Sequence, residues 1–126
     1  MSQLKRRVGG LAFRVARSPL GGRLVGRSFA HLSALLPVAK LHETAGLVAF
    51  YHPRPVHKVH ILIVPKQAIP SLLAVGPAAL PLMHAVVVVA QQLVEQLGLA
   101  EIGYRLIVNG GRYQDVPQLH FHLVAD

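Results

Sequence analysis

Residues 118–124 read Gln-Leu-His-Phe-His-Leu-Val, and this short stretch decides the fold that we expect for the chain. In a strand, successive side chains point to opposite faces of the sheet. Gln118, His120 and His122 would then share one face, with about 7 Å between neighbours. The apolar residues between them would line the opposite face, where they can close a core. The pattern predicts a half-buried strand whose polar face presents two imidazoles and an amide.

Other stretches indicate the elements around this strand. Four of them have the composition of strands and end at prolines or at turns: residues 38–41, 47–51, 59–64 and 104–108. Apolar residues at helical spacing predict one helix at 24–36 and a longer one at 77–97. The order of these elements predicts an α+β domain with about five antiparallel strands, a long helix and an N-terminal helix.

The composition is that of one folded domain. The chain has 126 residues, of which 52% are hydrophobic, and it has no cysteine. A chain of this length can bury a core without disulfides. The lack of cysteine excludes a disulfide scaffold, a thiolate zinc site and a cysteine nucleophile. No uninterrupted apolar stretch reaches the roughly 18 residues of a membrane span. We therefore expect a cytoplasmic protein with no membrane span.

Positive charge is concentrated near the N-terminus. The net charge is +8, and residues 1–30 contain seven Lys and Arg residues and no acidic residue. The remaining 96 residues contain six basic and five acidic residues. We divide the chain into a basic N-terminal arm, residues 1–22, and a domain, residues 23–126. The arm fits three interpretations: a solvated helix and loop on the domain, a segment that contacts nucleic acid or anionic lipid, or a signal for organelle import.

His60 lies within the most apolar strand, residues 59–64. A histidine among aliphatic residues needs a hydrogen-bond partner, and another imidazole or a ligand could supply it. Together with His120 and His122 it could form a site for phosphate, or alternatively for zinc. His57 precedes His60 by three positions and would face the other way on a strand, so we do not expect it in the cluster.

The loop at 109–118 reads Asn-Gly-Gly-Arg-Tyr-Gln-Asp-Val-Pro-Gln and leads directly into the histidine strand. Its glycines permit a ligand to approach the backbone, and consecutive free amides bind anions. The loop is therefore either an anion-binding element beside the imidazoles or an ordinary turn.

Taken in order, these motifs resemble the histidine-triad (HIT) superfamily, most closely its Hint branch of nucleoside phosphoramidate hydrolases and nucleotide-binding proteins. The resemblance spans residues 24–124. It rests on Leu-Val-Ala-Phe at 47–50, His-Ile-Leu-Ile-Val-Pro-Lys at 60–66, Gly-Tyr-Arg-Leu-Ile-Val-Asn-Gly at 103–110, and the run from Gln114 to Val124.

The resemblance implies nucleotidyl transfer through a histidine. His120 matches the family's nucleophile, whose neutral ring nitrogen attacks the α-phosphorus of a nucleoside phosphoramidate or related nucleotide. His122 matches a donor to phosphate oxygens, and His60 matches the upstream histidine that supports the cluster. No cofactor is required. The resemblance also implies a homodimer, to which the long helix and the strand at 104–108 could contribute the interface.

The resemblance also assigns substrate contacts. Asn109 and Gln114 match polar residues around the phosphate and the leaving group, and Phe50 is similar in position to a wall of the base pocket.

Three positions depart from the family pattern. Gln118 stands at the position of the first triad histidine, where an amide can form hydrogen bonds but cannot relay a proton. Asp115 replaces a serine near the phosphate, and His52 replaces an aspartate that contacts the ribose. These departures leave open a second interpretation, a non-catalytic module that binds a nucleotide or phosphate.

Overall fold

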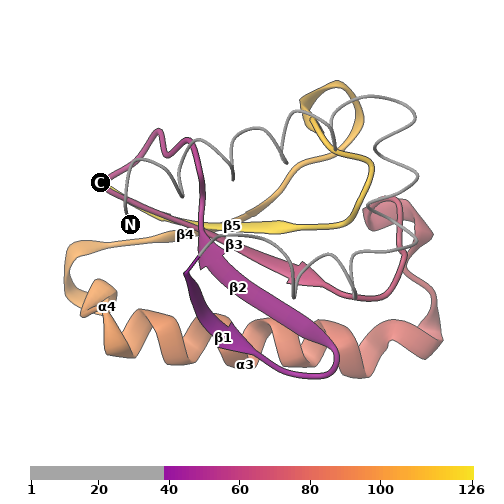
Figure 1. The fold of residues 1–126 in the computed structure, drawn as a ribbon, viewed down its shortest axis with the longest axis horizontal. Helices are drawn as coiled ribbons and strands as arrows, with labels where there is room; N and C mark the ends of the chain where they lie inside the picture. The colour runs from indigo at the N-terminus through magenta and orange to yellow at the C-terminus, as the bar shows by residue number, and fades with distance from the viewer. Residues whose placement is uncertain (1–38) are drawn as a thin grey trace.

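Five antiparallel strands form one sheet in the computed structural model, which describes residues 39–126 (Figure 1). The strands are β1 (Lys40–Glu43), β2 (Leu47–Tyr51), β3 (Val59–Pro65), β4 (Arg105–Val108) and β5 (Phe121–Ala125). Their order across the sheet is β1-β2-β3-β5-β4, so the last strand of the chain lies between β3 and β4. The predicted α+β class and five-stranded antiparallel sheet are confirmed.

Helical segments connect β3 to β4 and β4 to β5. They are the 3-10 turns η1 (Leu72–Ala74), η2 (Pro77–Ala79) and η3 (Gly111–Tyr113), and the helices α3 (Leu80–Gln96) and α4 (Leu99–Ile102). The long helix predicted at 77–97 is confirmed, except that its first residues form the 3-10 turn η2. The helix α3 ends two residues before Gly98, whose φ of 66° lies in the left-handed region that glycine adopts at low cost.

The helix α3 packs along one face of the sheet (Figure 1). Its buried residues recur at helical spacing: Val86, Val89, Ala90, Leu93 and Val94. They form one core with alternate residues of the strands, among them Leu47, Ala49, Ile61, Ile63, Phe121 and Leu123. The valine run would favour a strand by propensity alone, but packing on the sheet overrides that preference.

By length and composition alone, residues Pro77–Gln96 could also cross a membrane. The core helix of a globular domain passes the same test, and α3 packs on the sheet as such a helix does. The absence of a membrane span therefore stays a prediction.

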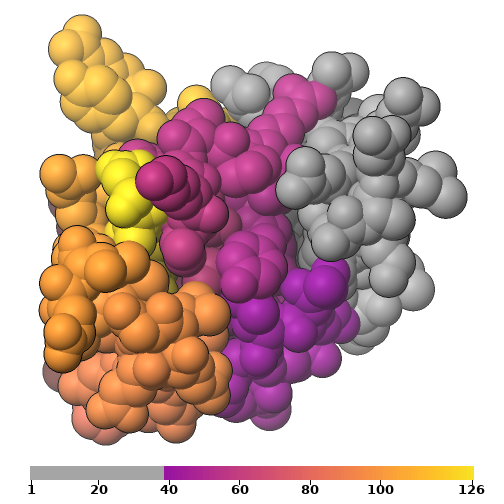
Figure 2. Space-filling model, turned by 90° about the vertical axis from the view of Figure 1, so that its left-hand side faces the viewer, coloured from indigo at the N-terminus to yellow at the C-terminus, as the bar shows by residue number. Residues whose placement is uncertain are grey.

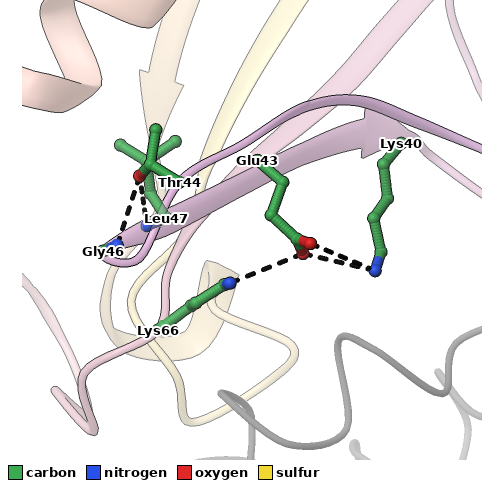
Figure 3. Close-up of polar contacts among 6 residues, drawn as sticks. All are labelled: Lys40, Glu43, Thr44, Gly46, Leu47 and Lys66. Carbon is green, nitrogen blue, oxygen red and sulfur yellow. Dashed lines mark hydrogen bonds and ion pairs between the residues drawn. The ribbon is translucent and has the colours of Figure 1, made fainter.

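A tight turn joins β1 to β2. The side-chain oxygen of Thr44 accepts hydrogen bonds from the backbone N–H groups of Gly46 and Leu47, at 3.2 and 3.1 Å (Figure 3). Because the turn begins at Thr44, β1 continues to Glu43. The strand expected at 38–41 is therefore displaced toward the C-terminus.

Ion pairs link this hairpin to the end of β3. Glu43 lies 3.2 Å from the ammonium group of Lys40 and 3.5 Å from that of Lys66 (Figure 3). The backbone N–H of Lys66 also donates to the carbonyl of Gly46 at 2.9 Å. Lys66 therefore binds the β1–β2 hairpin, although it directly follows β3, which carries His60.

The start of the last strand was predicted wrongly. Its ladder with β3 runs from Val59 opposite Ala125 to Ile63 opposite Phe121, so residues 118–120 precede the strand. The backbone N–H of Leu119 instead donates to the carbonyl of Ile69, in the segment that follows β3. The predicted N-terminal helix at 24–36 and the basic arm at 1–22 lie outside the described residues, and the domain boundary at residue 23 stays a prediction.

Candidate active site

Two histidines on adjacent strands form the centre of the candidate site. His60 of β3 and His122 of β5 lie on the sheet face opposite α3, and Nε2 of His60 is 2.9 Å from Nδ1 of His122. The backbone N–H of Val56 donates to Nδ1 of His60 at 3.2 Å. In neutral His60 the hydrogen is therefore on Nε2, which donates to His122. Neutral His122 then carries its own hydrogen on Nε2.

His120 stands beside His122, with 5.0 Å between the ring centroids and an edge-to-face arrangement. Its Nδ1 lies 2.7 Å from the backbone carbonyl oxygen of Gln118. Because a carbonyl can only accept, Nδ1 carries the hydrogen. The lone pair of neutral His120 is therefore on Nε2. The site thus combines a basic ring nitrogen on His120 with a neighbouring N–H donor on His122.

Gln118 does not share the histidine face, and that expectation is wrong. Its side chain is fully buried, and its amide N–H groups donate to the carbonyls of Pro65 and Gln67 at 3.0 and 2.9 Å. The alternation of a strand does not apply to Gln118, because the strand begins at Phe121. What Gln118 offers the histidines is its backbone carbonyl.

The histidine face continues onto β2 at Phe50 and onto His52, which follows β2 in the chain. Phe50 pairs with Leu62, and Leu62 pairs with His122, so these three residues lie in one row across the sheet. The His52 ring packs on His60 at a centroid distance of 4.3 Å. Its Nδ1 accepts the N–H of Arg54 at 2.9 Å, which leaves the hydrogen of the neutral ring on Nε2.

His57 joins the cluster, contrary to expectation. Its ring meets His60 edge-on at 5.3 Å between centroids, and its Nδ1 lies 2.8 Å from a carboxylate oxygen of Asp126. Figure 2 shows the C-terminal end of β5 (yellow) beside the segment that follows β2 (magenta). His57 precedes β3, so strand alternation does not govern it. The prolines at 53 and 55, which interrupt a ladder, were the available signal.

The loop between β4 and β5 brings its residues to the site in different ways. The last pair of the β4–β5 ladder is Val108 opposite Phe121, and Asn109 and His120 are the residues that directly adjoin this pair in the chain. The amide of Gln114 donates to the carbonyls of Pro70 and Val116, at 2.7 and 3.0 Å, as part of the backbone framework. The η3 part of the loop projects from the body of the protein (Figure 2).

Asp115 is exposed, and its charge reaches the cluster. The carboxylate raises the pKa of both His120 and His122, although burial, the larger effect, lowers both. The negative charge of Asp115 would therefore repel an anionic substrate bound beside His120 and His122.

Burial keeps the clustered imidazoles neutral. Burial, followed by the neighbouring imidazoles, lowers the pKa of His122 to about 4 and that of His52 to about 3. Burial also lowers the pKa of His60, with His57 contributing, and that of His120. At neutral pH the four rings are uncharged, so the hydrogen-bond directions given above hold.

The arrangement suits attack on an electrophilic phosphorus. A neutral ring with a fixed tautomer presents a lone pair, and the adjacent ring presents a donor for an oxygen that becomes more negative. Among residues 39–126, no group of three or more His, Asp or Glu side chains is arranged to hold a metal ion. A zinc site stays an alternative that metal analysis of untagged protein would test.

Comparison with known proteins gives consistent matches. The HIT domain family model matches residues 35–126. A purine nucleoside phosphoramidase of Escherichia coli (strain K12) is 38% identical over 92 residues, which cover 71% of this chain and 77% of that protein. An uncharacterized HIT-like protein of Helicobacter pylori (strain ATCC 700392 / 26695) is 35% identical over 92 residues, covering 71% of this chain and 86% of that protein.

A solved structure agrees in fold. The crystal structure of a HIT family hydrolase from Legionella pneumophila Philadelphia 1 matches with a TM-score of 0.71 and 30% sequence identity. The match covers 78% of this chain and 88% of that chain.

Proposed function

The chain belongs to the HIT family, and on that premise we propose that it hydrolyses nucleoside phosphoramidates or related nucleotides at the α-phosphate, through a nucleotidyl group on His120. The superfamily and the fold inferred from the sequence motifs are confirmed. A relative is named as a purine nucleoside phosphoramidase, and this supports the proposed substrate class.

One observation carries the proposal: the Nδ1 of His120 is held by a backbone carbonyl at 2.7 Å. This contact leaves Nε2 as the nucleophilic nitrogen, and burial lowers the pKa of the ring so that it remains neutral at physiological pH. The Nε2–H of His122, oriented by His60, is the donor for a phosphoryl oxygen.

The proposed reaction has two steps. Nε2 of His120 bonds to the α-phosphorus as the bond from phosphorus to the leaving amine breaks, and the amine takes a proton from solvent. The imidazole keeps its hydrogen on Nδ1 and becomes positively charged, which the carbonyl of Gln118 stabilises. Water then attacks phosphorus, the bond to His120 breaks, and the nucleoside monophosphate leaves as a proton returns to solvent.

The remaining predicted contacts surround this centre. We propose that Asn109, which directly follows the last pair of the β4–β5 ladder, contacts the phosphate, and that Phe50 lines the base pocket in the row of His122. His52 is proposed to contact the ribose. Gln114 remains a predicted contact of the leaving group, although its amide N–H groups already bond backbone carbonyls.

The direct test uses an adenosine phosphoramidate. The protein should release the amine and the monophosphate, and a rapid quench should trap one nucleotidyl group on His120. His120→Ala should reduce turnover about 1000-fold or more, since it removes the nucleophile. His84→Ala, at an exposed position on α3, is the matched control and should leave turnover unchanged. Amine release by the His120→Ala variant at the wild-type rate would overturn the proposal.

A binding module without turnover is the second candidate. Two observations favour it: the side chain of Gln118 faces away from the histidines, and the charge of Asp115 reaches them. Calorimetric binding of a nucleoside monophosphate, with no hydrolysis of any phosphoramidate offered, would establish this alternative.

A homodimer is also proposed. Among the described residues β4 is an edge strand, and apolar side chains around it are exposed: Ile102, Tyr104 and Leu106. A second copy could pair with this edge and cover these side chains. Light scattering on the purified chain measures the mass directly, and a Leu106→Lys variant should shift it toward the monomer.

A further inference from the structure

Backbone carbonyls at the end of β3 and in the segment that follows it hold the segment that leads into β5. The side-chain amide of Gln118 donates to the carbonyls of Pro65 and Gln67. The backbone N–H of Leu119 donates to the carbonyl of Ile69 at 2.7 Å. Gln114 donates in the same way to Pro70 at 2.7 Å. We call these four acceptors, the carbonyls of Pro65, Gln67, Ile69 and Pro70, the carbonyl seam.

Gln118 is the member of this arrangement that touches the chemistry. Its side chain bonds the seam, while its own backbone carbonyl receives the Nδ1–H of His120. The residue is 1% exposed, so water cannot replace the amide donors. Its side-chain oxygen is buried without a hydrogen-bond partner in the described part of the chain. The site therefore uses the NH₂ end of the amide and leaves the acceptor end unused.

We propose that Gln118 is a positioning residue for the reaction: its amide fixes the peptide whose carbonyl selects the reactive tautomer of His120. This rests on the proposed function, because it concerns the nucleophile of that reaction. In this role the side chain does not contact the substrate and does not transfer a proton.

The chemistry explains how glutamine can occupy this position. Two carbonyls of the seam must be satisfied from one side chain, and a primary amide carries two N–H donors. A neutral imidazole carries only one. Glutamine can therefore bind both carbonyls, and no step of the proposed reaction requires a histidine at position 118.

The test reads the tautomer without any turnover. Nitrogen NMR of histidine-labelled protein should show His120 protonated on Nδ1 in the wild type. Gln118→Met, which keeps the length but removes both donors, should give a mixture of the two tautomers. Gln114→Met is the matched control: it removes two donors from the same framework but leaves the carbonyl that holds His120, and its His120 signals should match the wild type.

Two results would overturn the proposal. One is a His120 tautomer that is unchanged in the folded Gln118→Met variant, and the other is an equal change in Gln114→Met. If the methionine variant does not fold, Gln118→Asn carries the same test, since its shorter amide cannot reach both carbonyls. A wild-type tautomer in the asparagine variant would also overturn the proposal.

Kinetics separates this inference from the proposed function. Gln118→Met should lower kcat about tenfold to a hundredfold, because small displacements of a reacting group have effects of that size. Gln118→His, which keeps one of the two donors, should have a kcat between those of Gln118→Met and the wild type. A gain of tenfold or more in Gln118→His would mean that a proton relay is missing, and would overturn the inference. If the wild type has no turnover, the proposed function fails, while the NMR comparison still decides the role of Gln118.

Discussion

The two faces of the sheet are built from alternate residues of the same strands, yet they differ in chemistry. Along β3 and β5, Ile61 and Leu123 join the core against α3, while their neighbours His60 and His122 meet on the opposite face. The aliphatic face packs against α3 and stabilises the fold, whereas the other face holds neutral imidazoles in fixed tautomers. Because a shift of one residue in register would exchange the faces, stability on one side secures the geometry on the other.

The largest expected effect concerns the helix-facing side. Leu123 is fully buried in the core, so Leu123→Ala should lower the free energy of unfolding by about 2–5 kcal/mol. Urea unfolding followed by circular dichroism measures this loss. Turnover per folded molecule should change little. The comparison of the faces would fail if His122→Ala, one position away, destabilised the protein as much while leaving turnover intact.

The next effect concerns the donor that orients His122. His60→Ala removes the N–H bonded to His122, so the tautomer of His122 is no longer fixed. We expect kcat to fall about a hundredfold. Steady-state kinetics on the adenosine phosphoramidate measures the change. His57→Ala is the comparison: its ring meets only the edge of His60 within the cluster, and a loss as large as that of His60→Ala would contradict this order of importance.

The pH dependence should distinguish the histidine face from an exposed histidine. Because burial lowers the pKa of His120, kcat/KM should stay level as the pH falls to the ordinary histidine value of about 6.5, and decline only below it. Stability should follow the same direction. The pKa of His122 is about 4 when folded, so the unfolded chain takes up protons first and the free energy of unfolding decreases from about pH 6.5 toward pH 4. An acid limb centred at or above 6.5 would contradict this account.

The smallest expected effect concerns Asp115. Its carboxylate raises the pKa of His120 and His122, so Asp115→Asn should move the acid limb to lower pH. It should also lower KM for an anionic substrate by a few-fold, since a surface charge nearby contributes about 1 kcal/mol or less. Both come from one pH–rate series. Raising the ionic strength should reduce the difference in KM between variant and wild type, and a difference insensitive to salt would point away from charge.

Much of the fold followed from periodicity. The strand-type composition of 47–51 and 59–64, bounded by turns and prolines, and the spacing of Val86, Val89 and Leu93 identified two strands and the long helix close to their observed bounds. The errors fell at the ends of elements, where individual hydrogen bonds set the boundary. Thr44 delays the turn after β1, and the bond from Leu119 to Ile69 delays the start of β5.

The candidate site followed less completely. The sequence motif predicted that His60, His120 and His122 form one cluster, and the structure places them side by side. Strand parity failed for Gln118 and His57, because both lie just outside a strand. Parity is a property of an extended ladder and gives no information beyond its last paired residue.

The sequence alone determined which residues alternate, where helices and strands lie, and which motif the histidines form, because periodicity and residue chemistry are local. Only the tertiary structure decided which nitrogen of each imidazole carries its hydrogen, and that Gln118 bonds carbonyls rather than faces the site. Some of these outcomes depend on partners distant in the chain, such as Pro65 for Gln118 and His60 for His122. Others depend on sequence neighbours that the fold holds in place, such as the carbonyl of Gln118 for His120. A hydrogen bond is set by the position and direction of both groups, and packing of the whole sheet brings such partners within reach.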